Sequence, residues 1–232
     1  MRSPTIVFDL DGTLVDTAPD LVAALNHVFN REGMPPVPYE QARNMVGGGA
    51  RVMIERGLIA EGRTLPAADI DRLVRDFIAH YAAHIADRSR PFDGAEAALD
   101  ELAGRGCRLA VCTNKLEWLS LRLLDALGLT RRFAAICGSD TFGVGKPDPA
   151  TLLQTLARAG GDPREAVMIG DSVTDIATAR AAKVPVVAVD FGYTETPVAD
   201  LNPDRVVSAF ADLSQVVFDL IGPHRNGIAG DR

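Results

Sequence analysis

The sequence predicts an α/β protein: a Rossmann-like parallel sheet with helices on both faces, plus a small all-helical unit inserted after the first strand. Short apolar runs alternate with helical patterns along most of the chain, which is typical of a parallel sheet. The runs are apolar almost throughout, as expected for strands covered on both faces. Residues 17–89 interrupt this alternation with helical patterns alone.

Six apolar runs are the predicted strands, and together they place the α/β core in residues 1–16 and 90–232. Amphipathic patterns at Glu117–Leu127 and Pro149–Ala159 predict helices between strands. The polar tail from about Gly222 is expected to fray. The predicted strands are Thr5–Phe8, Arg108–Cys112, Ala134–Cys137, Ala166–Ile169, Val184–Val189 and Arg205–Val207.

The segment 17–89 is predicted to be a helical domain of its own. Asp16 or Thr17 can cap its first helix, and the apolar stripe in Ile70–Tyr81 predicts another helix. A structureless loop of this length is implausible inside a compact domain. Ser89–Pro91 is the expected return to the core.

Composition narrows the class of protein. The net charge of −7 argues against a broad nucleic-acid surface, but it allows a local cationic pocket for a small anion. No apolar run approaches the ~20 residues that span a bilayer, and the first run ends in carboxylates, unlike a signal peptide. The cysteines, Cys107, Cys112 and Cys137, form no Cys-x-x-Cys pair and favour a reducing compartment. We therefore expect a soluble cytoplasmic protein with no membrane or nucleic-acid partner.

Two carboxylates, Asp9 and Asp11, directly follow the first predicted strand. Open α/β sheets place their sites at this end of the strands. Like charges held so close need a cation or a shared proton, and Gly12 lets the backbone leave the strand sharply. An aspartate-rich turn that caps a helix is the alternative for these residues alone.

Three later segments extend this pattern. Thr113-Asn114 follows an apolar run, Lys146 lies in Gly-Lys-Pro-Asp-Pro, and Asp171 and Asp175 follow another apolar run. In this order, the four segments resemble the four motifs of the haloacid dehalogenase-like hydrolases. The second aspartate, Asp11, is a mark of the phosphatase branch of that superfamily.

The resemblance implies a phosphomonoesterase that forms an aspartyl-phosphate. Such a reaction needs an in-line nucleophile, for which Asp9 is the candidate, and a general acid and base, for which Asp11 is the candidate. Asp9, Asp11 and Asp171 also make a hard oxygen site that suits Mg²⁺. By resemblance, Asp9 and Asp171 would bind the metal through side chains and Asp11 through its backbone carbonyl.

The other motif residues have supporting tasks. By resemblance, Thr113 and the backbone N–H of Asn114 would hold the phosphoryl oxygens, and Lys146 would neutralise the charge on the transferring group. Asp175 is a candidate for orienting Lys146 or a metal-bound water, although an acid favoured by a helix dipole is an equal alternative. Thr13 is a further candidate for supporting the site from behind.

The segments Val46–Ala50 and Val52–Arg56 look like those of the phosphoglycolate phosphatases, which implies 2-phosphoglycolate, a small phosphorylated metabolite, as substrate. In this region, Gly48 and Arg51 are candidate contacts to the leaving group, with a flexible turn and a solvated surface residue as the respective alternatives. A pyrophosphatase, another small-phosphoester phosphatase, a β-phosphoglucomutase-like phosphomutase and a catalytically silent binding module on the same fold remain open.

Three other patterns favour plain interpretations. Gly143–Lys146 lacks the spacing of a P-loop, and Gly47–Gly49 follows no strand, so it is no dinucleotide fingerprint. His80 and His84 have helical spacing but no metalloprotease glutamate, which favours a solvated helix face.

Overall fold

The computed structural model describes residues 3–194 and 196–225. Its strands are β1 Thr5–Phe8, β2 Val15–Asp16, β3 Arg90–Pro91, β4 Arg108–Cys112, β5 Ala135–Cys137, β6 Ala166–Gly170, β7 Val186–Val189 and β8 Arg205–Val207. Its α-helices are α1 Ala18–Arg31, α2 Tyr39–Arg43, α3 Ala50–Ala60, α4 Ala67–Ala83, α5 Ala95–Gly104, α6 Glu117–Ala126, α7 Pro149–Arg158, α8 Val173–Ala182 and α9 Leu213–Arg225. The tail predicted to fray from about Gly222 begins within α9, and residues 226–232 lie outside the described part.

Six strands form one sheet in the order β5-β4-β1-β6-β7-β8, and every neighbouring pair is parallel. All six predicted strands are present, which confirms the predicted fold class. Since the strands run the same way, their carboxyl ends lie at one edge. β1 lies between β4 and β6, so the segments that follow these three strands are neighbours at that edge.

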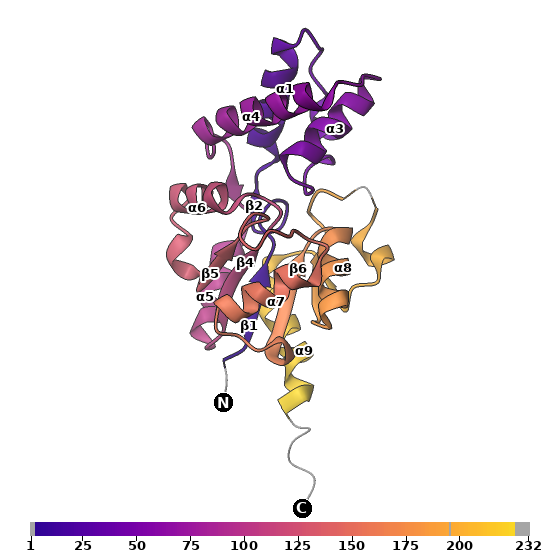
Figure 1. Ribbon diagram of the computed structural model, residues 1–232. Coiled ribbons are helices and arrows are strands. Elements are labelled where there is room, and N and C mark those ends of the chain that lie inside the picture. Colours follow the sequence, from indigo (N-terminus) through magenta and orange to yellow (C-terminus); the bar gives the residue numbers. More distant parts are fainter. Residues whose placement is uncertain (1–2, 195, 226–232) are drawn as a thin grey trace, which may run out of the picture.

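Both faces of the sheet are buried, as the apolar runs predicted. Ile6 and Phe8 of β1 belong to a core that includes residues of α5 and α9, while Val7 belongs to a second core with residues of α7 and α8. This alternation follows from the pleat, because successive side chains point to opposite faces. Figure 1 shows the helices around the sheet, with α7 and α8 against it. Cys107, Cys112 and Cys137 are buried, and none of the three forms a disulfide.

Helices α1 to α4 form a separate layer above the carboxyl edge of the sheet (Figure 1). α1 and α3 pack on α4, and the buried residues between them include Leu25, Phe29, Ile54 and Phe77. Two short strands, β2 and β3, pair antiparallel where the chain leaves and re-enters the core. This arrangement accords with the helical unit expected for residues 17–89.

The turn after β1 is tight, as expected from Gly12. Gly12 has φ +83°, and a Cβ there would lie 2.5 Å from Asp171 Oδ2, so only glycine fits. Thr17 is the residue before α1, but its hydroxyl donates to Asp11 Oδ1 (2.7 Å) and does not cap the helix. None of the described helices is both long and apolar enough to cross a membrane.

Candidate active site

The sequence motifs meet at the carboxyl edge of the sheet. Asp9 directly follows β1, Thr113 follows β4, and Asp171 follows β6. Because these strands are adjacent and parallel, the three residues emerge side by side. All three are buried beneath the helical unit.

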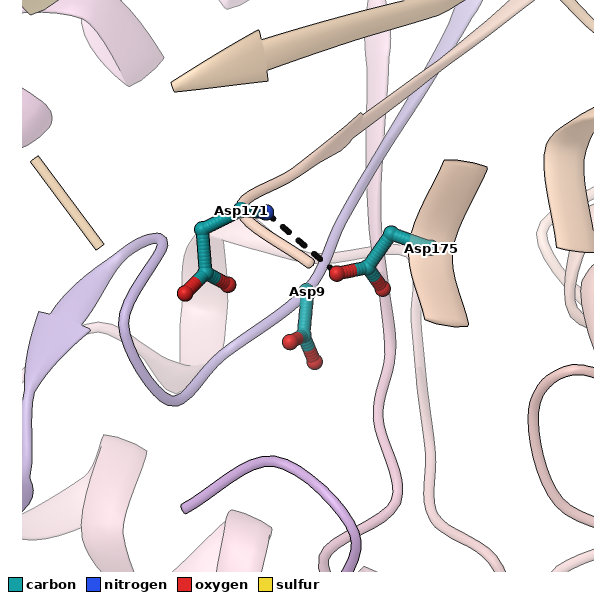
Figure 2. A group of neighbouring side chains, drawn as sticks. All are labelled: Asp9, Asp171 and Asp175. Carbon is teal, nitrogen blue, oxygen red and sulfur yellow. Dashed lines mark hydrogen bonds between the residues drawn. The ribbon is translucent and has the colours of Figure 1, made fainter. Parts of the chain in front are cut away.

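Asp9, Asp171 and Asp175 form an aspartate cluster. One carboxylate oxygen from each lies within 4.8 Å of the other two, and all three residues are buried. Figure 2 shows Asp9 and Asp171 facing a common space, with Asp175 entering from α8. Among the described residues, no other group of three or more His, Cys, Asp or Glu side chains is arranged to hold a metal.

Burial works against the negative charges of this cluster. It raises the pKa of Asp9 to about 6, although the nearby Lys146 ammonium partly opposes the shift. Burial, reinforced by the carboxylates of Asp175 and Asp9, raises the pKa of Asp171 to about 8. The fully ionised form of the three carboxylates is therefore stable only when further positive charge lies close to them.

Lys146 supplies one such charge. Its Nζ lies 2.8 Å from Asp9 Oδ1 and 2.6 Å from Asp175 Oδ1. Burial alone would discharge the amine, but the carboxylates of Asp175 and Asp9 outweigh it and raise the pKa of Lys146. The Asn114 side chain fixes the lysine backbone, accepting from Lys146 N (2.9 Å) and donating to Lys146 O (3.1 Å).

Asp175 is held by its own helix start. Its Oδ2 accepts hydrogen bonds from Ser172 Oγ, Ser172 N and Asp171 N, and Ser172 Oγ accepts from Asp175 N to complete a capping box. With Oδ1 on Lys146, both oxygens of Asp175 are engaged. The carboxylate thus positions Lys146 and shapes the turn that carries Asp171.

Asp171 is oriented from two sides. Thr13 Oγ1 donates to its Oδ1 (2.9 Å), and the Tyr193 backbone N–H donates to its Oδ2 (2.8 Å). Thr13 therefore lies where it can support the site from behind. Each oxygen can still accept a further bond, because a carboxylate oxygen can accept more than one.

The cluster fits a small, hard divalent cation. Its donors are carboxylate oxygens, which such cations prefer. Asp9 Oδ1 is buried and accepts no well-formed hydrogen bond, although it lies beside the Lys146 ammonium. The pKa values of Asp9 and Asp171 are raised because the nearby side-chain cations do not fully compensate their negative charges in this buried site. Asp9 and Asp171 are the two members of the cluster whose carboxylate oxygens can still bind a cation, because both oxygens of Asp175 are already engaged.

The side chain of Asp11 lies outside the aspartate cluster and contacts a different cation. Its Oδ2 lies 3.1 Å from Nζ of Lys115, a buried lysine that the sequence motifs did not single out. The ammonium also donates to the hydroxyl of Tyr81 (3.1 Å), which comes from α4 of the helical unit. Asp9 and Asp11 thus each have a buried ammonium beside them, Lys146 for Asp9 and Lys115 for Asp11.

Thr113 and Asn114 lie beside the nucleophile candidate. Thr113 N donates to Cys137 O, while Thr113 Oγ1 accepts from Lys115 N at 3.2 Å and keeps its own proton to donate. The Asn114 amide additionally donates to Gly47 O (3.3 Å) in the loop before α3. Asn114 therefore joins the core loop, the Lys146 loop and the helical unit.

A cavity of about 420 Å³ lies over these groups, between the helical unit and the core. Asp11 and Lys146 lie at its core side, and Gly48 and Arg51 line it from the helical unit. Arg51 is half-exposed, and its guanidinium pairs with Asp71 and Glu55. Its proposed contact with a substrate carboxylate therefore stays a prediction.

The histidines expected on a solvated helix face have close neighbours. The His80 ring stacks on His27 with centroids 3.8 Å apart, and His84 Nδ1 lies 2.8 Å from Asp87 Oδ2. His84 is exposed and His80 is half-buried.

Sequence reasoning missed four residues of the site: Lys115, Tyr81, Tyr193 and Ser172. Lys115 follows Thr113-Asn114 directly, so its place in a motif at a strand end was an available signal. Ser172 precedes an acid at the spacing of a capping box. Tyr81 and Tyr193 reach the site through contacts between distant segments, for which the sequence carries no local pattern.

Comparisons with known proteins agree with this geometry. Residues 6–189 match the family model of the haloacid dehalogenase-like hydrolases. A phosphoglycolate phosphatase of Agrobacterium fabrum is 50% identical over 217 residues, covering 94% of this chain and 93% of the relative. One of Caulobacter vibrioides is 49% identical over 221 residues, covering 95% and 93%.

Solved structures extend the likeness to the fold. The crystal structure of a predicted phosphoglycolate phosphatase from Haemophilus somnus superposes with a TM-score of 0.86 at 28% identity, covering 93% of this chain and 98% of the other. A putative phosphoglycolate phosphatase from Lactobacillus delbrueckii gives 0.85 at 26% identity, covering 94% and 99%.

Proposed function

The chain belongs to the haloacid dehalogenase-like hydrolases. We propose that it is a magnesium-dependent phosphatase that hydrolyses 2-phosphoglycolate to glycolate and phosphate. One observation carries the proposal. A buried carboxylate, Asp9, lies 2.8 Å from the buried ammonium of Lys146, and Lys146 lines a cavity of about 420 Å³. The names and identities of the relatives support the choice of substrate.

The first chemical step uses Asp9 as nucleophile. One Asp9 oxygen attacks phosphorus, the new P–O bond forms in line with the ester P–O bond that breaks, and the ester oxygen leaves with its electron pair. Asp11 donates a proton to that oxygen, giving glycolate. Lys146 stays beside Asp9 and offsets the negative charge on the transferring phosphoryl group.

The second step releases phosphate. Asp11 takes a proton from a water, whose oxygen attacks phosphorus and breaks the bond to Asp9. Thr113 Oγ1 and the Asn114 N–H would hold phosphoryl oxygens through both steps. Asp9 and Asp171 would hold Mg²⁺ with Asp11 contributing its carbonyl, and the ion supplies charge neutralisation on the phosphoryl oxygens.

The helical unit of residues 17–89 is proposed as a cap that covers the cavity during these steps. It meets the core through the Asn114–Gly47 and Lys115–Tyr81 contacts and joins it through β2 and β3. Excluding water from a phosphorylated enzyme until the leaving group departs is a recognised benefit of such closure.

Phosphate release from a panel of phosphoesters tests the proposal. The panel contains 2-phosphoglycolate, pyrophosphate, ethyl phosphate and a sugar phosphate, each with Mg²⁺ and with excess chelator. We expect the highest kcat/KM for 2-phosphoglycolate and no turnover in chelator. Preference for another ester would reject the substrate, an isomerised sugar phosphate would indicate a phosphomutase, and no reaction with any ester would favour a silent binding module.

A further inference from the structure

The cavity must bind the leaving group of the substrate as well as its phosphoryl group. Its walls are largely apolar, with Leu21, Val74, Phe77, Ile78, Leu116 and Leu119 among the lining residues. A carboxylate placed in such surroundings requires a cation or several N–H donors. Three cationic side chains line the cavity: Lys146, Arg51 and Lys115.

Two of these cations have other tasks. Lys146 Nζ is held between Asp9 and Asp175 at 2.8 and 2.6 Å, where it serves the phosphoryl end. Arg51 is 47% exposed at its side chain and already pairs with Asp71 and Glu55. Neither is a free buried cation for the leaving group.

Lys115 differs in burial and in spare hydrogen-bonding capacity. Its side chain is 5% exposed. An ammonium has three N–H donors, and the described residues give it two oxygen partners, Tyr81 Oη and Asp11 Oδ2, each at 3.1 Å. One donor remains for a ligand in the cavity. A buried lysine–aspartate pair is also weak evidence for a purely stabilising role, because desolvation opposes the attraction.

The chemistry of the substrate brings its carboxylate to this position. In 2-phosphoglycolate only one methylene separates the ester oxygen from the carboxylate carbon. The ester oxygen must lie beside Asp11 to receive its proton, so the carboxylate lies near Asp11 as well. The cation that flanks Asp11 is Lys115.

We propose that Lys115 is the specificity-determining residue that binds the carboxylate of the leaving group, with Tyr81 of α4 as a positioning residue that holds its ammonium. This inference rests on the proposed function and deepens it. It also explains how the helical unit takes part in substrate choice, since the Tyr81 hydroxyl reaches Lys115 only when α4 lies over the core.

Steady-state kinetics on two matched substrates test the proposal. Lys115→Met removes the charge and keeps a flexible apolar side chain. Arg51→Met tests the competing prediction that Arg51 binds the carboxylate, and Arg31→Met, which alters a cation paired with Asp76 away from the cavity, is the control. With Mg²⁺ present, we expect Lys115→Met to lower kcat/KM for 2-phosphoglycolate by about 10- to 100-fold more than for ethyl phosphate, which lacks the carboxylate. Arg51→Met and Arg31→Met should each change the ratio between the substrates by less than about threefold.

A binding measurement separates substrate recognition from an indirect effect on Asp11. Calorimetry would compare 3-phosphonopropionate, a non-hydrolysable analogue that keeps the carboxylate, with propylphosphonate, which lacks it. Wild type should bind 3-phosphonopropionate more tightly, and Lys115→Met should bind both alike. Equal losses on both substrates, an unchanged ratio, or loss of discrimination in Arg51→Met instead would overturn the proposal.

Two further measurements separate a folding defect, or a wrong substrate, from failure of the Lys115 proposal. Circular dichroism checks that Lys115→Met folds. If it does not, Tyr81→Phe replaces it and should raise KM for 2-phosphoglycolate several-fold more than for ethyl phosphate; an unchanged ratio would then overturn the proposal. If wild type discriminates between the phosphonates, Lys115→Met does not, and wild type releases no phosphate from 2-phosphoglycolate, the proposed substrate fails while carboxylate recognition by Lys115 stands.

Discussion

Asp9 lies where the proposed reaction needs its nucleophile, directly after β1 and beside Lys146. Asp9→Asn keeps the shape of the side chain but cannot form an aspartyl-phosphate. We expect phosphate release to fall by at least about a thousandfold. The melting temperature should stay the same or rise, because burial disfavours the charge of Asp9. Substantial activity, in protein shown by mass spectrometry to be free of deamidation, would reject Asp9 as nucleophile.

Because Asp9 and Asp171 are buried, the stability of the protein should depend on pH and on a bound cation. Asp9 and Asp171 have pKa values raised to about 6 and about 8, so the folded state retains protons that the unfolded chain releases near pH 4. Stability from this source is present at low pH and is lost as the pH rises from about 4 through 8. A bound cation offsets the repulsion at the higher pH.

We therefore expect Mg²⁺ to raise the melting temperature more at pH 8 than at pH 5. Thermal melts with magnesium and with chelator at both pH values measure this difference. Asp171→Asn is the control and should reduce the magnesium effect at pH 8. An equal effect of magnesium at both pH values would contradict the assignment of the ion to this cluster.

Site residues at strand ends were visible in the sequence, and those reached through tertiary contacts were not. Asp9, Thr113 and Asp171 each follow a short apolar run, so a parallel sheet brings them to one edge. Tyr193 lies between β7 and β8, yet its backbone N–H binds Asp171 and its hydroxyl accepts from Ala18 N. No period or spacing in the sequence connects Tyr193 to Asp171.

The packing of α3 against α1 can be tested by mutation. Gly57 in α3 faces α1, and a Cβ there would lie 2.7 Å from the buried Phe29 ring. We expect Gly57→Ala to destabilise the protein by about 1–3 kcal/mol, because the added methyl would push against a fully buried ring. Denaturant unfolding measures the change in free energy.

Gly104 is the matched control. It ends α5 and is exposed, and a Cβ added there would meet no atom within 4 Å. Gly104→Ala should therefore be neutral or stabilising by up to about 0.5 kcal/mol, through the helix preference of alanine alone. A Gly57→Ala protein as stable as the control would mean that α1 and α3 are less tightly packed than the structure indicates.

The helices were predictable from repeating periodicity and the sheet strands from continuous apolar runs, while the two-residue strands β2 and β3 were not predictable. The predicted sheet strands agree with the structure to within about two residues, while β2 and β3 have only two residues each and carry no usable alternation. The predicted Thr17 cap of α1 was also wrong for a physical reason. The Thr17 hydroxyl bonds the Asp11 carboxylate, a tertiary partner that replaces the local one.

The helical unit and the α/β core form two layers that meet over the cavity. The chain passes between the helical unit and the core only at β2 and β3, where Val15 pairs with Pro91 and Asp16 with Arg90. Side-chain bonds across the interface include those of Asn114, Lys115 and Arg43. We expect the two layers to move relative to each other, with the cavity enclosed only when they meet.

Arg43 of α2 offers a way to shift that motion without touching the cavity. Its Nη2 donates to Gly192 O (3.3 Å) and its guanidinium lies 5.4 Å from the centroid of the Tyr193 ring, next to the backbone that holds Asp171. Arg43→Ala should favour the open arrangement. A smaller closed fraction weakens apparent substrate affinity in proportion, so KM for 2-phosphoglycolate should rise about 3- to 30-fold with a smaller change in kcat.

Small-angle scattering distinguishes this effect from a local disturbance of the site. Arg43→Ala should show a larger radius of gyration than wild type, and a saturating phosphonate ligand should bring the two values together. Arg31→Ala is the control, because Arg31 pairs with Asp76 inside the helical unit and should alter neither KM nor the radius. A raised KM with an unchanged radius of gyration would place the role of Arg43 in orienting Tyr193 and Asp171 and would reject the opening of the two layers as its cause.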